Sequence, residues 1–398
     1  MSKSLQGGDP RRSIMFKNVE KIGEGAFGTV YRAFDCSRGH RVALKKLRLR
    51  DVRVLPPTVV RELSALRHIA HANVMTLLDY HVRSSSLVLV LPYLPHNLGE
   101  LLSRMDMPLL EAHAQRLARM LIAGLAALHA GRLLHRDIKP TNLLLSHEGV
   151  LKIADMGQAR LRPAHEDASL SHAVATRWYR APELLFGSRR YGYEVDIWAA
   201  GCVIAQLINS TPLMAGDSDI DQLFRVITLL GTPTPQSWRG LDSLPDYHKL
   251  ELPACSAIPL QRCLPHSSTA LVRLLAHMLR WDPKQRPSAA EALRCEWMLL
   301  ASSQPLHLPP HDVIRAPVAE DAMPDALVRG RDQQVRPAAA ALATIPPGRP
   351  VSVNSGGRQT ARLPLFPAKG CSAVTALPGT AAAVRRELHR ARALMRGL

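Results

Sequence analysis

Three closely spaced glycines, Gly23, Gly25 and Gly28, separate two segments that have the character of β-strands, residues 16–22 and 29–33. Glycines with this spacing occur in dinucleotide-binding folds, where a helix follows them, and in hairpins that lie over nucleotide phosphates. The segment after them is β-branched and aromatic and does not resemble the start of a helix. The sequence therefore favours a phosphate-covering hairpin, although the spacing alone is weak evidence for one.

Lys45 ends a short apolar strand that is expected at residues 42–45. At this distance after a glycine-rich hairpin, a lysine can reach the α- and β-phosphates of a nucleotide, where it needs an acidic partner. Pro57 is expected to start a helix that runs to Leu66, and Glu62 on that helix is the natural partner. The alternative is that Lys45 and Glu62 are ordinary solvated side chains.

The pattern changes along the next part of the chain. Residues 74–78 and 87–91 are apolar runs of strand length, which complete a small, mainly antiparallel sheet with one helix. Residues 92–95 contain two prolines and predict an extended connector, whose free backbone groups could bind the edge of an adenine. Leucines spaced by three and four residues then predict a helix over residues 112–130, so a mainly helical domain begins here.

An acid, a base and an amide lie close together in residues 134–142. Asp137 could accept a hydroxyl proton, Lys139 could neutralise a transferring phosphoryl group, and Asn142 could hold a metal ion that bridges phosphates. Taken alone, this stretch is more readily a charged surface turn. The other motifs of the chain occur in an order that fits phosphoryl transfer, and they favour a chemical role for these residues over a surface turn.

Asp155 follows two short strands that are expected at residues 143–145 and 151–153. Its carboxylate would lie near Asn142, and such a pair of oxygen ligands suits magnesium held against phosphates.

In this order, the motifs resemble those of the eukaryotic protein kinases. They are Gly23-x-Gly25-x-x-Gly28-x-Val30, Val42-Ala43-Leu44-Lys45, Glu62, His135-Arg136-Asp137-x-Lys139-x-x-Asn142, Asp155-x-Gly157 and Ala181-Pro182-Glu183. The resemblance implies an α+β, bilobal fold, with a β-rich N-lobe that carries one regulatory helix, an α-rich C-lobe, and ATP with Mg²⁺ between them. The implied divisions are an N-terminal extension (1–15), a kinase domain (16–300) made of N-lobe (16–91), hinge (92–95) and C-lobe (96–300), and a tail (301–398).

The same resemblance assigns roles to single residues. The catalytic residues would be Asp137, Lys139 and Asn142, and the metal ligands would be Asn142 and Asp155. The ATP-binding residues would be Ile22, Gly23, Glu24, Gly25, Gly28, Val30, Ala43, Lys45, Glu62, Leu91, Pro92, Leu94 and Leu144. Met156 replaces the usual phenylalanine after Asp155, and its apolar, adaptable side chain can fill the same hydrophobic site beneath the Glu62 helix.

Three segments narrow the family. Residues 57–62 resemble the cyclin-binding helix of cyclin-dependent kinases, residues 174–183 resemble the substrate-docking segment of the wider group, and residues 231–238 resemble the start of an insert of that group. Ser171-His172-Ala173 lacks the Thr-x-Tyr of mitogen-activated kinases, which argues against that class. The overall pattern is similar to the cell-cycle-related kinase branch.

Ser171 occupies the position where cyclin-dependent kinases take an activating phosphate from an upstream kinase. Arg61, Arg136 and Arg160 match the basic residues that would receive this phosphate through charge-assisted hydrogen bonds. The alternative is an inert serine in a polar loop. Ala26 and Phe27 have no hydroxyl group, so the glycine-rich hairpin offers no site for inhibitory phosphorylation.

Thr176 and Arg180 are expected to recognise the substrate. In the kinases that this chain resembles, the arginine shapes a pocket that prefers proline directly after the phosphorylated residue, because proline has no N–H to leave unpaired. The resemblance therefore implies a serine/threonine kinase that acts on Ser/Thr-Pro sites of proteins, with a cyclin or cyclin-like protein as a candidate activator.

The composition limits which partners, which cysteine chemistry and which cellular location are expected. The net charge of +18 suggests anionic partners, but the basic residues are scattered and no aromatic residues alternate with them, which argues against nucleic-acid binding. The six cysteines form no Cys-x-x-Cys pair and are expected to be reduced thiols. No apolar run is long enough to span a membrane and the first residues do not resemble a secretory signal, so we expect an intracellular protein of the nucleus, the cytoplasm or both.

The tail is rich in proline, alanine, glycine and arginine, and we expect it to be disordered. Residues 381–398 could form a basic, partner-binding helix, or else a frayed, solvated one. Two alternatives to an active kinase remain at this point. One is a pseudokinase scaffold that binds a nucleotide or a cyclin without phosphoryl transfer, and the other is a basic nucleic-acid-binding protein with an incidental kinase domain.

Overall fold

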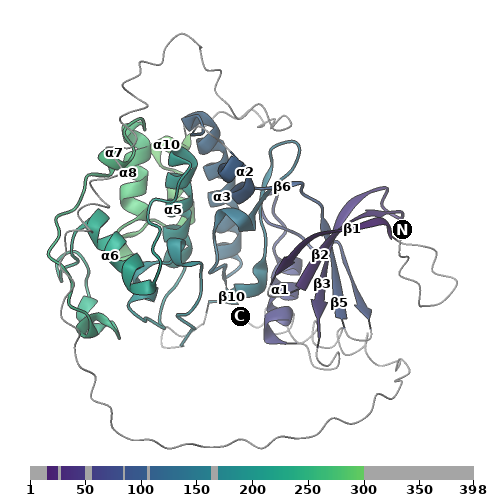
Figure 1. Ribbon diagram of the computed structural model, residues 1–398, viewed down its shortest axis with the longest axis horizontal. Coiled ribbons are helices and arrows are strands. Elements are labelled where there is room, and N and C mark those ends of the chain that lie inside the picture. Colours follow the sequence, from purple (N-terminus) through teal and green to yellow (C-terminus); the bar gives the residue numbers. More distant parts are fainter. Residues whose placement is uncertain are drawn as a thin grey trace, which may run out of the picture. The chain divides into compact units, whose positions relative to one another are not determined.

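The structure is a computed structural model, and the expected α+β architecture is confirmed, with a strand-rich first part and a helix-rich second part (Figure 1). The N-terminal extension, Ala26, Phe27 and the tail lie outside the described residues, so the expectations for them stay predictions. The described residues are 16–25, 28–49, 56–83, 86–104, 108–162 and 169–299.

Five antiparallel strands form the first sheet, in the order β1-β2-β3-β5-β4. The glycine-rich segment forms the turn between β1 and β2, where Gly25 pairs with Gly28, so the hairpin interpretation is confirmed. The strands are β1 (Phe16–Gly25), β2 (Gly28–Asp35), β3 (His40–Arg48), β4 (Asp79–Arg83) and β5 (Ser86–Pro92).

The strand expected at residues 74–78 was wrong, because the strand of this sheet begins only at Asp79. Val74 instead forms an isolated parallel bridge with Ile153, and the N–H of Met75 donates to the carbonyl of Ile153 over 2.9 Å. Both Val74 and Met75 are buried. An apolar run indicates that a segment is buried, but it does not indicate which element covers the segment. Here that element is a strand far along the chain.

Helix α1 (Pro57–His68) begins at a proline, as expected, because the preceding Pro56 is extended and proline tolerates the first helical position. Leu63 and Leu66 lie on its buried face. Glu62, on the same helix, is only 3% exposed. The helix therefore points a carboxylate and its apolar stripe inward together.

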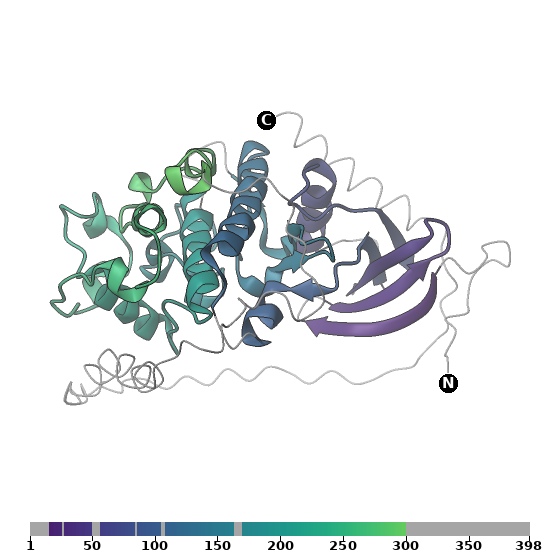
Figure 2. The same ribbon diagram turned by 90° about the horizontal axis from the view of Figure 1, so that it is seen from above.

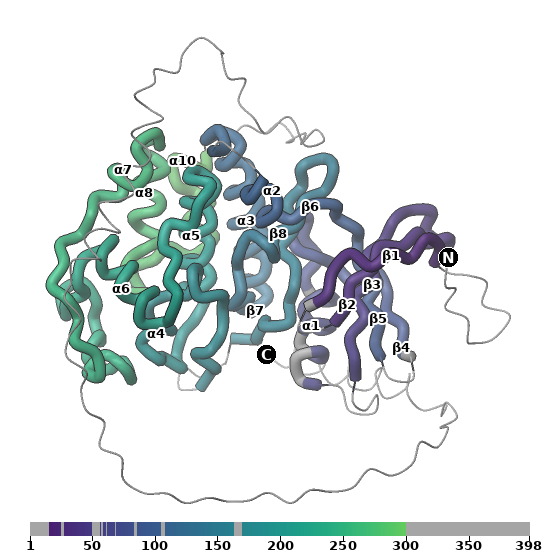
Figure 3. Tube along the Cα trace, viewed as in Figure 1, coloured from purple at the N-terminus to yellow at the C-terminus, as the bar shows by residue number. Residues whose placement is uncertain are grey.

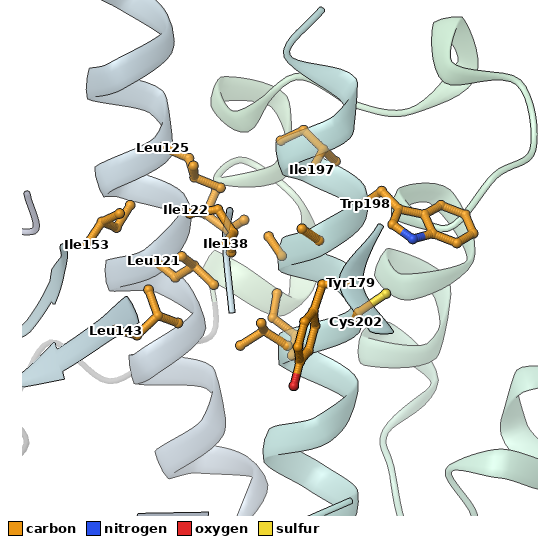
Figure 4. Packing of buried hydrophobic residues seen from close by; sticks show 14 of the residues in the cluster. Leu121, Ile122, Leu125, Ile138, Leu143, Ile153, Tyr179, Ile197, Trp198 and Cys202 are labelled. Carbon is orange, nitrogen blue, oxygen red and sulfur yellow. The ribbon is translucent and has the colours of Figure 1, made fainter. Parts of the chain in front are cut away.

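The second part of the chain is built around helix α5 (Glu194–Asn209), nearly all of which is buried. Leu121, Ile122 and Leu125 are buried apolar side chains of α3 (Glu111–Ala130) in the core that α3 shares with α5, whereas Trp198 points from α5 to the side away from α3 (Figure 4). The expected helix over 112–130 is thus confirmed. The other α-helices are α2 (Leu98–Arg104), α4 (Pro182–Leu185), α6 (Asp219–Leu230), α7 (Leu260–Cys263), α8 (Thr269–Met278), α9 (Ala289–Ala292) and α10 (Glu296–Leu299).

Short strands and turns lie between the helical part and the first sheet (Figures 2 and 3), and they carry the motifs of residues 135–142 and 155–157. Strands β8 and β9 form the hairpin expected at 143–145 and 151–153, and β6 pairs with β8. These elements are β6 (His96–Asn97), β7 (Leu133–Leu134), β8 (Leu143–Leu145), β9 (Leu151–Ile153) and β10 (Arg160–Leu161), with the 3-10 turns η1 (Pro140–Asn142), η2 (Met156–Gln158), η3 (Arg177–Tyr179), η4 (Leu241–Ser243), η5 (Tyr247–Lys249) and η6 (Pro283–Gln285).

Candidate active site

The loop between β7 and η1 is held by a buried carboxylate of α5. Asp196 accepts the backbone N–H of His135 over 2.9 Å and that of Arg136 over 2.8 Å. Its side chain also contacts Nε2 of His129 at 3.0 Å. Burial acts to raise the pKa of Asp196, but its partners outweigh burial and leave the pKa below its usual range, so the carboxylate stays charged. Asp196 therefore supports the backbone of this loop.

Asp137 lies at the centre of this loop and is only 8% exposed. Its Oδ2 accepts Nδ2 of Asn142 at 3.0 Å and lies 2.9 Å from Nζ of Lys139. Its Oδ1 accepts the backbone N–H and the hydroxyl of Thr176, both at 3.0 Å. The structure therefore brings together all three residues expected to be catalytic and fixes the carboxylate from both of its oxygens.

Thr176 also links Lys139 to Asp137, because its hydroxyl accepts Nζ of Lys139 at 2.9 Å and donates to Asp137. Residue Thr176 comes from the segment after Ser171, so the substrate-docking segment and the catalytic loop are joined directly. The sequence predicted a role for Thr176 in substrate recognition, but it gave no sign that its hydroxyl orients Asp137.

Lys45 on β3 is bonded to two carboxylates. Its Nζ lies 2.7 Å from Oε1 of Glu62 on α1 and 2.9 Å from Oδ1 of Asp155. The expected pairing of Lys45 with Glu62 is confirmed. Through Lys45, the sheet, the helix α1 and the segment after β9 are tied to one ammonium group.

Burial and charge act against each other in this cluster. Burial acts to lower the pKa of Lys45, but the carboxylates of Glu62 and Asp155 outweigh it and raise the pKa above its usual range. Burial also acts to raise the pKa of Asp155, but the ammonium of Lys45 outweighs it and holds that pKa below its usual range. Burial prevails at Glu62 and raises its pKa. Lys45 and Asp155 are therefore both charged at neutral pH.

Asp155 itself has a left-handed backbone with φ of 61°, an uncommon conformation for a residue that is not glycine. It directly precedes η2, where Met156 is fully buried, and η2 is in contact with α1. Met156 thus fills the apolar site beneath the Glu62 helix, as the sequence predicted.

The donor set around Asn142 and Asp155 fits a hard divalent cation. Nδ2 of Asn142 donates to Asp137, which leaves its amide oxygen as an acceptor. One oxygen of Asp155 accepts from Lys45 over 2.9 Å. The backbone N–H of Ala154 donates to the carbonyl of Asn142 over 2.8 Å, so the two candidate ligands come from adjacent backbone segments. Amide and carboxylate oxygens are ligands that Mg²⁺ accepts.

The residues expected to contact ATP lie on both sides of the connector. In the sheet register, Gly23 pairs with Val30, Val30 with Lys45, and Ala43 with Leu91. The rest lie on β1 (Ile22, Glu24 and Gly25), at the start of β2 (Gly28), at the end of β5 (Pro92), just after it (Leu94) and on β8 (Leu144). Of the residues named here, all but Leu94 and Leu144 lie in the sheet that carries Lys45.

Two of the glycines differ in what they require. Gly28 has φ of 154°, and a Cβ there would lie 2.2 Å from the carbonyl oxygen of Lys46, so the fold demands glycine. A Cβ at Gly23 would meet nothing within 4 Å among the described residues. Packing therefore gives no reason for glycine at position 23, whereas the close approach of a phosphate group would give one.

Arg180 arranges the backbone of the segment before it. Its Nε donates to the carbonyl of Val174 at 2.9 Å, its Nη2 donates to that of Ala175 at 3.0 Å, and its Nη1 pairs with Asp219 at 2.7 Å. Ala175 has a left-handed φ of 65°. Two backbone carbonyls are therefore already occupied at the position expected to receive the substrate.

Ser171 lies beside the loop, with an exposed side chain. The hydroxyl of Tyr191 donates to its carbonyl oxygen at 2.5 Å and accepts Nη1 of Arg136 at 2.9 Å. Arg160 is close enough to Tyr191 to act on its pKa. Of the four expected regulatory residues, Ser171, Arg136 and Arg160 thus lie together, and the side chain of Arg61 is outside the described residues. The sequence gave no signal for Tyr191.

Glu183 and Arg286 form a bidentate pair, at 2.7 and 2.8 Å. Both are buried, and the guanidinium of Arg286 lies 4.9 Å from the ring centroid of Trp198. This pair stabilises the segment that carries the site and takes no part in it.

Comparison with known proteins agrees with this geometry. Residues 16–298 match the family model described as the protein kinase domain. The chain is 40% identical over 293 residues to cyclin-dependent kinase 20 of Homo sapiens, covering 73% of this chain and 85% of that kinase, and 42% identical over 275 residues to that of Danio rerio, covering 69% and 80%. It is 40% identical over 300 residues to cell division control protein 2 homolog 3 of Trypanosoma brucei brucei, covering 74% and 95%.

Within the described ranges, none of the helices is both long and apolar enough to cross a membrane. The family match spans most of the chain and includes every element of the site described above. The chain belongs to the protein kinase family, and within it to the cyclin-dependent kinases.

Proposed function

We propose that this chain is an ATP- and Mg²⁺-dependent serine/threonine kinase that acts on Ser/Thr-Pro sites of proteins. The observation that carries the proposal is the set of contacts to Asp137, whose two carboxylate oxygens are held by Asn142, Lys139 and Thr176. A carboxylate that is fixed in this way, in a loop that α5 supports from below, suits the orientation and deprotonation of a substrate hydroxyl.

In the proposed reaction, Asp137 binds the hydroxyl of the substrate and takes its proton as the oxygen attacks the γ-phosphorus of ATP, and the bond from that phosphorus to the β,γ-bridging oxygen breaks to release ADP. Lys139, 2.9 Å from Asp137, stabilises the negative charge of the transferring group. Lys45 orients the α- and β-phosphates, and Glu62 holds Lys45 in place. Asn142 and Asp155 would hold Mg²⁺, which neutralises phosphate charge when it is bound.

The preference for proline rests on Arg180. Because the carbonyls of Val174 and Ala175 accept from Arg180, neither is free to pair with the N–H of the residue after the phosphorylated one. An unpaired N–H costs about 1–3 kcal/mol, and proline avoids this cost because it has no N–H.

A cyclin or cyclin-like protein is the proposed activator, and an upstream kinase that phosphorylates Ser171 is a second one. The chain is similar to cyclin-dependent kinase 20 of Homo sapiens, and α1 carries Glu62 to Lys45. A partner that packs on α1 would hold this pair together. We place this activity inside the cell, in the nucleus or the cytoplasm.

The test is phosphoryl transfer to a Ser-Pro peptide by the purified chain and by Asp137→Asn, each with and without a panel of cyclins. The substitution should lower kcat by about 10²–10⁴-fold, the usual range for loss of a general base. Asp242→Asn, an exposed carboxylate away from the site, is the matched control and should leave kcat unchanged. Equal transfer by the parent and Asp137→Asn would contradict the assignment, and binding of nucleotide or cyclin without any transfer would indicate a scaffold.

A further inference from the structure

Tyr191 bridges a catalytic-loop arginine and the segment that carries Ser171. Its hydroxyl accepts Nη1 of Arg136 at 2.9 Å and donates to the carbonyl oxygen of Ser171 at 2.5 Å. Burial raises the pKa of Tyr191, so the hydroxyl keeps the proton that it donates. The bond to Ser171 uses a main-chain atom and is independent of the serine side chain.

Arg136 is fixed on its other sides as well. Its Nε donates to the carbonyl of Gln158 at 2.8 Å, and its backbone N–H donates to Asp196. Its side chain is nearly buried, with the residue 5% exposed. The guanidinium is therefore held in place by neutral acceptors, Gln158 and Tyr191, that are part of the chain.

The segment from Leu170 to Thr176 is anchored at both ends. The N–H of Leu170 donates to the carbonyl of Arg189 at 2.8 Å, and Thr176 is bonded to Asp137. Tyr191 adds a third point near the first anchor, and Arg189 precedes it in the same loop. Because Thr176 orients Asp137, any loosening of this segment reaches the catalytic carboxylate directly.

We infer that Tyr191 is a positioning residue that holds this segment in its competent conformation without a phosphate on Ser171. The inference rests on the proposed function, because it concerns the rate of that same reaction. A phosphate on Ser171 would then add to an existing connection to Arg136, and the unphosphorylated chain would retain activity that depends on the hydroxyl of Tyr191.

The experiment uses the full chain with Ser171→Ala, which removes the phosphorylatable hydroxyl and keeps the carbonyl. In this background, Tyr191→Phe should lower kcat for a Ser-Pro peptide about tenfold, which corresponds to about 1.4 kcal/mol, and should leave the KM for ATP unchanged, because Lys45 and Glu62 are untouched. A purely structural role would lower the melting temperature without this separation of kcat from KM.

Tyr193→Phe is the matched control. The ring of Tyr193 stacks on His129 and lies under Arg162, and its hydroxyl makes no hydrogen bond within the described part of the chain. The same atom is deleted two residues away, so kcat should stay within about twofold of the background. A loss at Tyr191 equal to that at Tyr193 would overturn the inference.

A second measurement separates this inference from the proposed function. Hydrogen exchange of the amides of residues 170–175, followed without substrate, should be about tenfold faster in Tyr191→Phe than in Tyr193→Phe. This result would support the inference even for a chain that transfers no phosphate. Equal exchange in the two variants would refute it, whatever the activity of the parent.

Discussion

The backbone N–H of Arg136 donates to Oδ1 of Asp196 over 2.8 Å, which joins the catalytic loop to α5, a helix whose residues are nearly all buried. The neighbouring N–H of His135 donates to the other oxygen. Both hydrogen bonds are buried. The position of Asp137, which directly follows Arg136, therefore depends on the carboxylate of Asp196, which does not touch the substrate.

Replacing that carboxylate tests this dependence. Asp196→Asn puts an amide group where two N–H donors point, so one donor loses its acceptor. We expect a loss of about 3 kcal/mol in the free energy of unfolding, measured in urea, together with lower kcat. Asp242→Asn should change neither, and an Asp196→Asn variant as stable as the parent would contradict the argument.

Loss of Lys45 should be severe for catalysis and for stability. Lys45→Met is expected to lower kcat/KM about 10²–10³-fold and to destabilise the fold by about 3 kcal/mol, because Glu62 is left buried without its cation. Adding Glu62→Gln should restore part of the stability and none of the activity. Lys46→Met, at the next and exposed position of β3, serves as control. If the effects of Lys45→Met and Glu62→Gln on the free energy of unfolding were additive, the two residues would not be coupled.

The depressed pKa of Asp155 predicts a dependence of stability on pH. A carboxyl whose pKa is lower in the folded chain stabilises the fold above its ordinary pKa of about 4, and this contribution disappears as pH falls. The difference in melting temperature between the parent and Asp155→Asn should therefore be present at pH 7 and shrink below about pH 4. The Asp242→Asn difference should stay flat, and a difference for Asp155→Asn that grows toward acid would reverse the sign of the argument.

Arg286 should not be replaceable by lysine. The guanidinium makes two bonds to Glu183 and further bonds to the carbonyls of Arg280, Glu194 and Trp281, which a single ammonium cannot reproduce. Arg286→Lys is expected to cost about 3 kcal/mol in urea unfolding. The exposed Arg294→Lys should be neutral, and equal stabilities of the two variants would count against the pair.

Arg180 should set the preference for proline. Arg180→Ala frees the carbonyls of Val174 and Ala175, so a Ser-Ala peptide could pair its N–H there. The ratio of kcat/KM for Ser-Pro over Ser-Ala should fall about tenfold or more. Arg177→Ala removes the neighbouring contact to Asp219 without touching either carbonyl, and it should keep the preference. A parent that shows no preference for proline would refute the proposal before any substitution is made.

Much of the site was accessible from the sequence because its parts are local motifs. Asp137, Lys139 and Asn142 lie in one loop. The pairing of Lys45 with Glu62 was predicted because Lys45 follows the glycine-rich hairpin and Glu62 lies on the helix that starts at Pro57. The contacts of Asp137 with Lys139 and Asn142 and the pair of Lys45 with Glu62 are present in the structure.

The features that the sequence did not predict have one physical cause: they depend on contacts between residues that are far apart in the sequence. Val74 and Met75 are apolar enough for a strand but pair with Ile153, nearly eighty positions away by their numbers. Tyr191 reaches Arg136 over 55 positions. Neither partner is marked by local spacing or periodicity, because both patterns report only neighbours along one element.

The bridge between Val74 and Ile153 also limits how the molecule can move. The chain enters the helical part along residues 92–95, and the bridge is a second attachment between the same two parts, strengthened by the bond from Nδ2 of Asn73 to the carbonyl of Leu151 at 2.8 Å. The Lys45–Asp155 ion pair and the contact of α1 with η2 also join these two parts. Opening of the glycine-rich hairpin away from the catalytic loop should therefore separate Lys45 from Asp155 while the connector and the bridge stay in place, and sliding of one part over the other should be resisted.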